Sequence, residues 1–309
     1  MAPISHRKPL DPGPSTTCTD IAVLDQWHPI ASVAESPAGV PGSTTLLGVD
    51  IGYLVEGDGS ASAWVSDSRV QLPTLTRYGY VWASLGSPPD DLFEVAEYDE
   101  PDRRNVHGAT VGIHCSAPRA VENFLDMGHF PYVHTDYLGE EPHTEVAEYE
   151  VEIDAATGDI WAKECVFWQP MAAASAEGGQ MVDYLYRVPH PYCTVLYKSS
   201  PADESRMDVV CLFNQPLSED MIHGHMFVSY IDAEHSEAEL RRFSQTIFAQ
   251  DKPILENQYP KRLPLDPRAE TPIRADKVAI AYRRYLSELG VTYGVIPVEG
   301  NSSPVTATA

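Results

Sequence analysis

The segment Glu122-Asn-Phe-Leu-Asp-Met-Gly-His-Phe-Pro-Tyr-Val-His134 is the most informative part of the chain. It overlaps a helix that we expect from Ala117 to about Phe130. His129 and His134 stand five residues apart, about 140° round an unbroken helix, which is too far for easy chelation of one metal ion. Proline cannot continue a helix and pushes the preceding residue out of the α region. We therefore predict that the helix breaks at Phe130–Pro131 and swings His134 back towards His129.

Carboxylates complete a candidate metal site. Asp126 precedes His129 by three residues, so on a helix it would accept from the ring N–H that a metal-binding imidazole does not use. The best third ligand is Asp251, in Phe248-Ala-Gln-Asp-Lys-Pro-Ile-Leu-Glu-Asn-Gln258, where Pro253 would disturb a helix and aim the carboxylate inward. Glu256 is the competing carboxylate. Two imidazoles and one carboxylate on one face of Fe(II) leave positions open for O2. The alternative is two unrelated, partly buried histidines.

The rest of the pattern predicts an α+β fold. Short β-prone runs separated by Gly and Asp fill residues 27–100, and strand-like segments dominate from about 146 to 231. Such a pattern is typical of a small antiparallel β domain followed by a long antiparallel sheet. Helices are expected at Ser236–Gln258 and Asp276–Leu289, with Gly290 ending the second. The strands are expected at Leu46–Val55, Ser62–Ser66, Tyr78–Gly86, Ala147–Ile153, Trp161–Trp168, Met181–Val188, Cys193–Lys198, Met207–Phe213 and His225–Ile231.

Charge and composition exclude several classes of partner. The formal net charge is −24, so the surface repels nucleic acid and anionic lipid. No stretch approaches the length of a membrane span, and the first residues carry no apolar signal region. We therefore expect a cytoplasmic protein. The five cysteines are scattered without a C-x-x-C motif, which argues against both a disulfide framework and a zinc knuckle.

With these residues described, the chain resembles the α subunits of Rieske non-haem iron oxygenases, in the branch of the vanillate O-demethylases and methylxanthine N-demethylases. Asn123, Asp126, His129 and His134 match the iron motif of the family, and the resemblance implies that Asp251 is the third ligand. The resemblance further implies a Rieske-like antiparallel β domain before a helix-grip-like catalytic domain. Three further segments carry the resemblance, namely Trp27–Ser32, Tyr80–Pro88 and Arg274–Leu286.

The cluster ligands of the family are missing. A Rieske [2Fe–2S] centre is held by two cysteines and two histidines. No cysteine occurs between Cys18 and Cys115, and His28, His107 and His114 are the only histidines there. We therefore expect a degenerate Rieske-like domain and no bound [2Fe–2S] on this chain. The expected organisation is a mobile arm at 1–20, the degenerate domain at 21–105, the iron-containing catalytic domain at 106–297 and a disordered tail at 298–309.

The resemblance also implies an activity. It is that of an oxidoreductase, an O2-dependent monooxygenase whose Fe(II) centre hydroxylates an N- or O-methyl group with release of formaldehyde. A similar system of the family demethylates methylxanthines such as 7-methylxanthine. Its electrons would come from NAD(P)H through a partner reductase that carries a Rieske centre, with an accessory subunit, in a trimeric or hetero-hexameric assembly. Asp126 would link the partner's cluster to an iron ligand, and Asn123 would hydrogen-bond near the iron.

Two other functions stay open at this point. The chain could be a catalytically inactive structural or regulatory subunit of a Rieske oxygenase complex, since loss of the cluster is what such decay produces. It could also be a helix-over-sheet module that binds a hydrophobic ligand without chemistry. For a small aromatic or heteroaromatic methylated substrate, the candidate pocket residues on the expected strands are Trp168, Tyr184, Tyr186, Asn214, Gln215, Phe227 and Tyr230.

Overall fold

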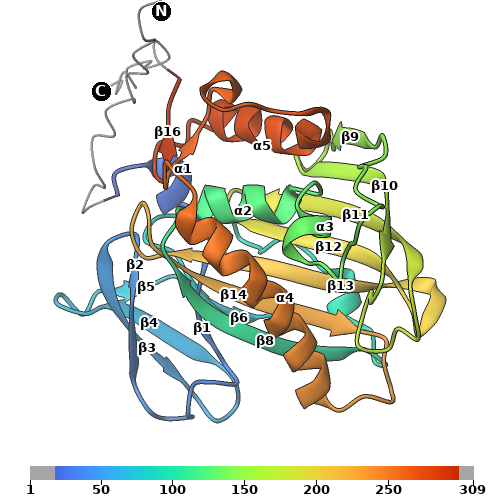
Figure 1. The fold of residues 1–309 in the computed structure, drawn as a ribbon. Helices are drawn as coiled ribbons and strands as arrows, with labels where there is room; N and C mark the ends of the chain where they lie inside the picture. The colour runs from blue at the N-terminus through green and yellow to red at the C-terminus, as the bar shows by residue number, and fades with distance from the viewer. Residues whose placement is uncertain (1–17, 299–309) are drawn as a thin grey trace, which may run out of the picture.

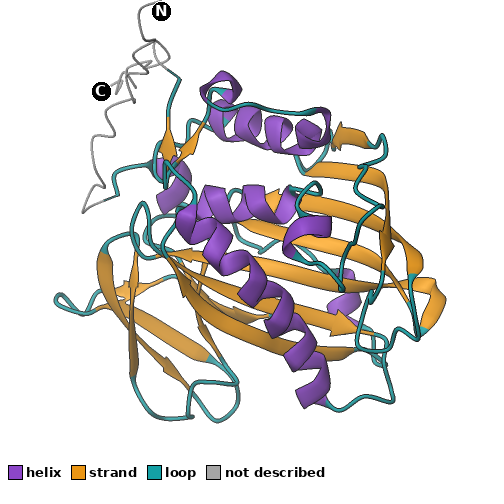
Figure 2. Cartoon of the chain, in the orientation of Figure 1, coloured by secondary structure: helices purple, strands orange, loops and turns teal. Residues whose placement is uncertain are grey.

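A seven-stranded antiparallel sheet forms the centre of the computed structural model, which describes residues 18–298. Helices cover one face of this sheet, and they lie together in front of it in Figure 1 and Figure 2. Residues 1–17 of the expected arm and 299–309 of the expected tail lie outside the described part of the chain. In spatial order the strands are β8 (Arg104–Ile113), β14 (Ile222–Tyr230), β13 (Asp203–Pro216), β12 (Cys193–Ser200), β11 (Gln180–His190), β10 (Ile160–Gln169) and β9 (Glu150–Ile153).

The two faces of the large sheet bury different sets of side chains, because successive residues of a strand point to opposite faces. In β13, Phe213 belongs to an aromatic core on the far face, whereas Leu212 belongs to the core under the helices. A three-stranded sheet covers the far face with aromatic side chains, among them Tyr80 and Trp82. Its strands, in spatial order, are β1 (His28–Ser32), β7 (Tyr80–Ala83) and β6 (Thr74–Arg77).

A four-stranded sheet makes up most of the remaining N-terminal region, and it lies beside the large sheet in Figure 1. The expected single strand Leu46–Val55 is wrong, because the chain reverses within it. Leu47 and Gly48 have φ values of 52° and 81°. Two consecutive positive φ values are the geometry of a two-residue hairpin turn. The strands of this sheet are β2 (Gly42–Leu46), β3 (Val49–Val55), β4 (Ala61–Val65) and β5 (Gln71–Leu72).

The helices confirm most of the sequence expectations. The α4 helix matches the one expected at Ser236–Gln258, and the side chain of Ser236 caps its N-terminus. The α5 helix ends just before Gly290, whose φ is +75°. The helices are α1 (Ile21–Leu24), α2 (Ala117–Leu125), α3 (Phe130–Val133), α4 (Glu237–Asn257) and α5 (Lys277–Glu288), and the short 3-10 helices are η1 (Ala96–Asp99), η2 (Pro267–Ala269) and η3 (Arg274–Asp276). A two-stranded parallel pair, β15 (Leu263–Pro264) and β16 (Val295–Ile296), completes the elements.

The structure corrects three local expectations. The helix breaks after Leu125 rather than at Phe130–Pro131, and Pro131 lies in the first turn of the new helix, where its missing N–H is harmless. The α4 helix continues through Pro253. The strand β8 was not expected from the sequence, and the expected domain boundary after residue 105 falls inside it. Since β8 pairs with β14 from the second half of the chain, Arg104 and Asn105 are part of the large sheet.

Taken together, the elements confirm an α+β fold with mostly antiparallel sheets. Within residues 18–298, no helix has both the length and the apolar character that crossing a membrane requires.

A buried ionic cluster fixes α2 against α5. Arg119, only 1% exposed, contacts Glu122 at 2.9 Å and Glu270 at 2.6 Å. Arg283 of α5 pairs with the same two carboxylates. Buried charges are stable only when they are paired and hydrogen-bonded. The cluster therefore holds α2, and with it the segment that leads to the two histidines, in one position.

The variant Arg119→Met tests this role. It leaves two buried carboxylates with a single guanidinium, so we expect the free energy of unfolding to fall by about 3–5 kcal/mol. Urea unfolding followed by circular dichroism measures the change. The matched control is Arg268→Met, because Arg268 makes an exposed ion pair with Asp266 and its loss should leave the unfolding midpoint unchanged. Equal effects of the two variants would contradict the assignment.

Candidate metal centre and substrate cavity

The two histidines lie at the two ends of the one-turn helix α3. Asp126 caps the end of α2 in extended conformation, with φ −76° and ψ 116°. His129 is the residue before α3 and His134 the residue after it. One turn of helix returns the chain to the same side, so the two Nε2 atoms lie 3.1 Å apart. The predicted proximity of the imidazoles is thus present, although a short loop and a new helix produce it rather than a kink at Pro131.

Asp251 reaches the histidines from the buried face of α4. The buried residues of this helix are spaced at intervals of three or four positions, which places them on one stripe. Asp251 occupies that stripe between Phe248 and Leu255, so helix periodicity aims it inward, and no distortion at Pro253 is needed. The Oδ1 atom of Asp251 lies 3.3 Å from Nε2 of His129 and 3.1 Å from Nε2 of His134. The buried residues of α4 are Leu240, Ser244, Phe248, Asp251 and Leu255.

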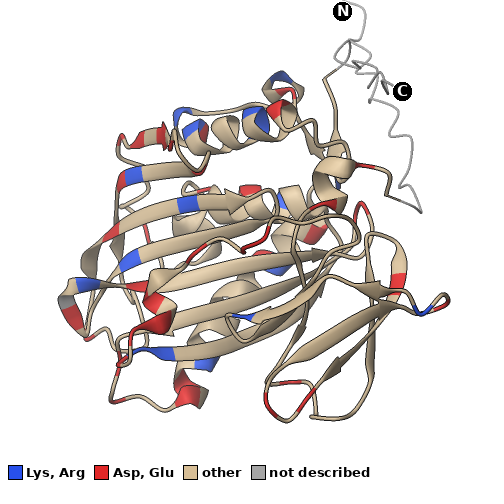
Figure 3. Cartoon of the chain, turned by 180° about the vertical axis from the view of Figure 1, so that it is seen from behind, with Lys and Arg blue, Asp and Glu red and all other residues tan. Residues whose placement is uncertain are grey.

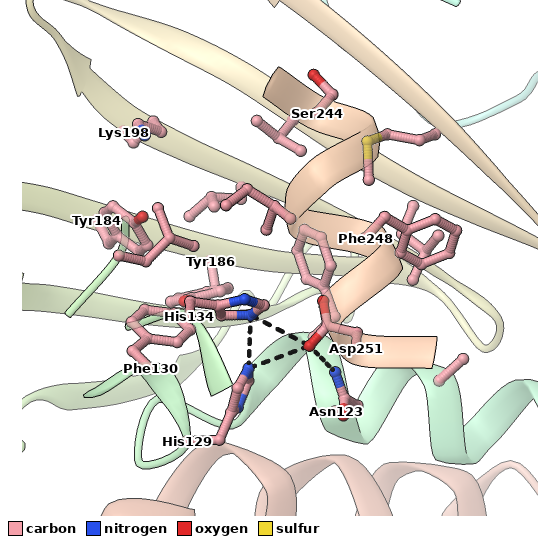
Figure 4. A pocket seen from close by; sticks show the side chains of 18 of the residues that line it. Asn123, His129, Phe130, His134, Tyr184, Tyr186, Lys198, Ser244, Phe248 and Asp251 are labelled. Carbon is pink, nitrogen blue, oxygen red and sulfur yellow. Dashed lines mark hydrogen bonds and ion pairs between the residues drawn. The ribbon is translucent and has the colours of Figure 1, made fainter. Parts of the chain in front are cut away.

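A second layer of hydrogen bonds orients these three side chains. The Nδ1 atom of His129 lies 3.2 Å from Asp126 Oδ2, and Nδ1 of His134 lies 2.9 Å from Gln250 Oε1. Each of these oxygens is suited to accept a ring N–H, which leaves both Nε2 lone pairs directed at the common centre. The side-chain amide of Asn123 donates to Asp251 Oδ1 at 3.2 Å. Figure 4 shows His129, His134, Asn123 and Asp251 converging.

The charges of the centre are coupled. Burial opposes a positive charge on His129, but hydrogen bonds to Asp126 and Asp251 outweigh it and raise the pKa of His129 to about 9. Burial also opposes the charge of Asp251, and the two histidines overcome this and lower its pKa to about 2. Without a metal ion, a proton on His129 thus supplies the positive charge that the buried carboxylate requires.

The donor set fits a divalent iron site. His129, His134 and Asp251 form the one group of three or more His, Cys, Asp or Glu side chains within residues 18–298 that could hold a metal ion. Two ligand atoms at right angles, each about 2.1 Å from an ion, would lie roughly 3.0 Å apart. The separations of 3.1–3.3 Å match that requirement. Two imidazoles with one carboxylate are the facial ligand set typical of non-haem iron enzymes.

An apolar cavity extends from this centre between α4 and the large sheet. Its empty volume is about 800 Å³ with the open solvent at its mouth included. Beside the metal-site group, the wall consists mainly of aliphatic and aromatic side chains. The wall residues outside the metal-site group, with the polar Lys198 and Ser244 included, are Ala120, Phe124, Phe130, Leu138, Tyr184, Tyr186, Leu196, Lys198, Val210, Leu212, Met226, Tyr230, Phe243, Ser244, Ile247, Phe248 and Leu255.

Three of the seven expected pocket residues line this cavity, namely Tyr184, Tyr186 and Tyr230. The other four do not. Phe227 packs in the aromatic core on the far face of the sheet, because it points to the opposite face of β14 from Met226. The amides of Asn214 and Gln215 donate instead to the carbonyl oxygens of other segments. Trp168 lies outside the cavity, where its indole N–H donates to Glu140.

The competing carboxylate Glu256 is also away from the centre. Its carboxylate accepts from Lys252 and from the backbone N–H of His114. Sequence reasoning missed the role of Gln250, although Gln250 directly precedes Asp251. It also missed Lys198 and the apolar residues Phe243 and Ile247 of α4. The apolar residues recur with helical spacing in a helix that was expected, so the signal for them was present.

Comparisons with known proteins identify the family. The sequence profile of the vanillate O-demethylase oxygenase C-terminal domain matches residues 113–292. A protein named as a probable methylxanthine N7-demethylase, NdmC of Pseudomonas sp. strain TJI-51, is 44% identical over 272 residues, 88% of this chain and 96% of that protein. The chain belongs to the Rieske non-haem iron oxygenases. The expected family and enzyme class, an oxidoreductase of the monooxygenase and demethylase type, are thereby confirmed.

Solved structures agree with this assignment at the level of the fold. NdmA of Pseudomonas putida CBB5, solved with caffeine, matches with a TM-score of 0.70 at 21% identity, over 86% of this chain and 91% of that one. A dicamba monooxygenase bound to dicamba matches with a TM-score of 0.66 at 16% identity, over 86% and 97% of the two chains. The expected fold class of a Rieske oxygenase is therefore confirmed, and the family implies an iron cofactor.

The raised pKa of His129 predicts how metal affinity depends on pH. A divalent ion held by this triad has to displace the proton of His129 at any pH below about 9. The apparent affinity for Mn(II) or Co(II) should therefore rise about tenfold per pH unit between pH 7 and 9 and then level off. Calorimetric titration at several pH values measures this.

The variant Asp126→Asn provides the control. It weakens the interaction that favours protonated His129, so the rise should level off at a lower pH than in the wild type. An affinity that does not change between pH 7 and 9 would contradict the prediction.

Proposed function

We propose that this Rieske oxygenase is the catalytic subunit of an N-demethylase, which uses Fe(II) to hydroxylate the methyl group of a methylxanthine such as 7-methylxanthine. The observation that carries the proposal is the facial group of His129, His134 and Asp251 at one end of an apolar cavity. The relative named as a methylxanthine N7-demethylase, which matches nearly along its whole length, supports the substrate class. The cavity walls suit a planar heteroaromatic molecule.

The reaction inserts one oxygen atom of O2 into a methyl C–H bond and reduces the other to water with two electrons and two protons. The hydroxymethyl product then loses formaldehyde and leaves an N–H group. Bound iron would supply the O2 activation. The chain supplies the rest. His129, His134 and Asp251 hold the ion, Asn123 orients the carboxylate through Oδ1, and Phe248 with its apolar neighbours excludes water from the reacting methyl group.

We further propose that the electrons come from a partner protein on the side of α2 that faces away from the cavity. NAD(P)H would be oxidised by a partner reductase with its own Rieske centre, since this chain has no cysteine between Cys18 and Cys115. A polar hollow lies on the side of α2 away from the cavity, and Asp126 is among its lining residues. The Asp126 side chain is 37% exposed while it contacts His129, so a docked cluster could reach an iron ligand through it. An accessory subunit and a trimeric or hetero-hexameric assembly belong to the same proposal.

The acidic surface does not by itself assign the docking face. Figure 3 shows Asp and Glu spread over loops, strand ends and helices of the rear side rather than gathered in one patch. The hollow beside Asp126 is the better candidate, because it adjoins the metal centre.

The alternative is a catalytically inactive subunit. The preserved outer hydrogen bonds argue against it, because Asp126 and Gln250 both hold the imidazoles with their Nε2 atoms facing Asp251. A structural subunit has no chemical need for a buried group of this kind, which is costly to bury without an ion or proton.

Reconstituted turnover tests the proposal. The chain loaded with Fe(II), and supplied with NADH and a Rieske-bearing reductase, should convert 7-methylxanthine to xanthine with one equivalent of formaldehyde. His134→Ala should lose the iron and reduce turnover by more than about a hundredfold, since even outer-layer changes cost 10–100-fold. Formaldehyde assay and iron analysis measure both.

The matched control is Glu256→Gln, which changes a partly exposed carboxylate on the same helix as Asp251 and should keep both iron and turnover. Iron binding without formaldehyde from any methylxanthine or methoxybenzoate would favour the inactive subunit. Full iron content in His134→Ala would refute the metal site itself.

The variant Asp126→Asn separates electron delivery from metal binding. Asparagine keeps an oxygen that can accept from His129 Nδ1, so iron affinity should fall by no more than about 10–100-fold. At saturating Fe(II), turnover driven by the reductase should fall further, whereas reduction of the iron by dithionite should proceed as in the wild type. An equal loss of both rates would show that Asp126 only positions His129.

A further inference from the structure

The cavity carries one charged group that the metal centre does not use. Lys198 of β12 is 4% exposed and lines the wall. In Figure 4 it lies on the far side of the cavity from His129 and Asp251. Its parity in β12 explains its direction, because Leu196 and Lys198 share the face under the helices while Val195 and Tyr197 belong to the aromatic core beyond the sheet.

The ammonium group of Lys198 has unused hydrogen-bonding capacity. It donates to the carbonyl oxygen of Ala172, and Nζ lies 5.8 Å from the centre of the Tyr184 ring. Among the described residues, no carboxylate lies within ion-pairing distance of it. Asp208 acts on it only at longer range, and its own Oδ1 accepts from the backbone N–H of Ile231. An ammonium group can donate three hydrogen bonds.

Other polar groups at this end of the cavity are neutral, and most are engaged. Ser244 donates to the carbonyl of Leu240, and its oxygen lies 3.0 Å from the hydroxyl of Tyr230. The Tyr184 hydroxyl accepts from Gln169 at 2.6 Å. The Tyr186 hydroxyl has no partner within the described chain, but it carries no charge. Lys198 is therefore the one cation at this end of the cavity, among the lining residues that lie away from the metal centre.

Keeping a cation in an apolar wall without a paired anion is costly. Burial lowers the pKa of Lys198 to about 8, and Asp208 opposes this only in part. At neutral pH the group is still mostly charged. A ligand that brings a strong hydrogen-bond acceptor to Nζ would offset the cost of burial.

The wall between Lys198 and the metal centre is aromatic. The ring of His134 lies 5.9 Å from that of Phe130, and Phe130 lies 6.0 Å from Tyr184, which lies next to Nζ. Two aromatic side chains, Phe130 and Tyr184, thus lie between the cation and His134. A fused two-ring molecule lying along this wall would place one end at each.

We propose that Lys198 is a specificity-determining residue, which binds the oxygen acceptor at the end of the substrate opposite the methyl group that is removed. This inference rests on the proposed function for its substrate class. In 7-methylxanthine the C2 carbonyl lies at the edge farthest from the N7 methyl group, so a hydrogen bond from Nζ to that oxygen directs the methyl group towards His129, His134 and Asp251. A carboxylate opposite a methoxy group, as in 4-methoxybenzoate, would present the same acceptor chemistry.

Binding to the metal-free chain tests the anchor without any turnover. Calorimetry should show that the wild type binds 7-methylxanthine roughly 10–100-fold more tightly than 7-methylhypoxanthine, which has the same methyl group but lacks the C2 oxygen. Lys198→Met should bind the two ligands with the same affinity, which is weaker than that of the wild type for 7-methylxanthine. Neither ligand can form the hydrogen bond between Nζ and the C2 oxygen once the lysine is gone. The matched control is Lys163→Met on β10, whose lysine pairs with Glu152 on the surface and should leave the ratio unchanged.

If Lys198 has a purely structural role, such as fixing the segment at Ala172, Lys198→Met would weaken the binding of both ligands equally. The ratio of their two affinities would then be preserved. That result in a folded variant overturns the proposal. If Lys198→Met does not fold, Lys198→Gln keeps a donor for the Ala172 carbonyl and should still reduce the ratio; an unchanged ratio there also overturns it. Binding of 4-methoxybenzoate but not 7-methylxanthine, lost in either variant, would reject the methylxanthine substrate while supporting the anchor.

Discussion

The rest of the structure depends on one buried carboxylate. Asp251 lies on the stripe of α4 that packs against the sheet, where an unpaired charge would be costly. The imidazoles of His129 and His134 satisfy it, and they can do so only because the chain breaks between α2 and α3. A position of α4 that would otherwise be filled by an aliphatic side chain therefore becomes the floor of the metal centre.

Much of this centre could be predicted from the sequence. The residue types of Asp126, His129, His134 and Asp251 limit the chemistry to a metal site with one accessory carboxylate, and the structure brings all four together. The predicted effects of the two prolines on the helices were wrong. Pro131 begins a helix instead of breaking one, and Pro253 lies within an intact helix. The local conformational preferences of proline do not include the tertiary packing that holds α3 and α4 in place.

Features that depend on contacts across the sheet could not be predicted. The strand β8 has two glycines and little apolar periodicity, and it is a strand because β14 pairs with it along nearly its full length. Among the cavity residues, aromatic character alone could not distinguish the two faces of a strand, so Phe227 was assigned to the wrong one. Lys198 follows an apolar run and looks like its exposed end; only the fold shows that it is buried.

The α2 helix also separates two spaces. Ala120 and Phe124 face the apolar cavity, Glu122 and Asp126 face the polar hollow, and Asn123 borders both. Residues two positions apart point about 200° apart around a helix, so the two spaces open on opposite sides. A small molecule in the cavity leaves the hollow free, and a protein docked at the hollow leaves the cavity free. With the partner reductase that we propose, this arrangement favours a sequential kinetic order through a ternary complex over a ping-pong exchange.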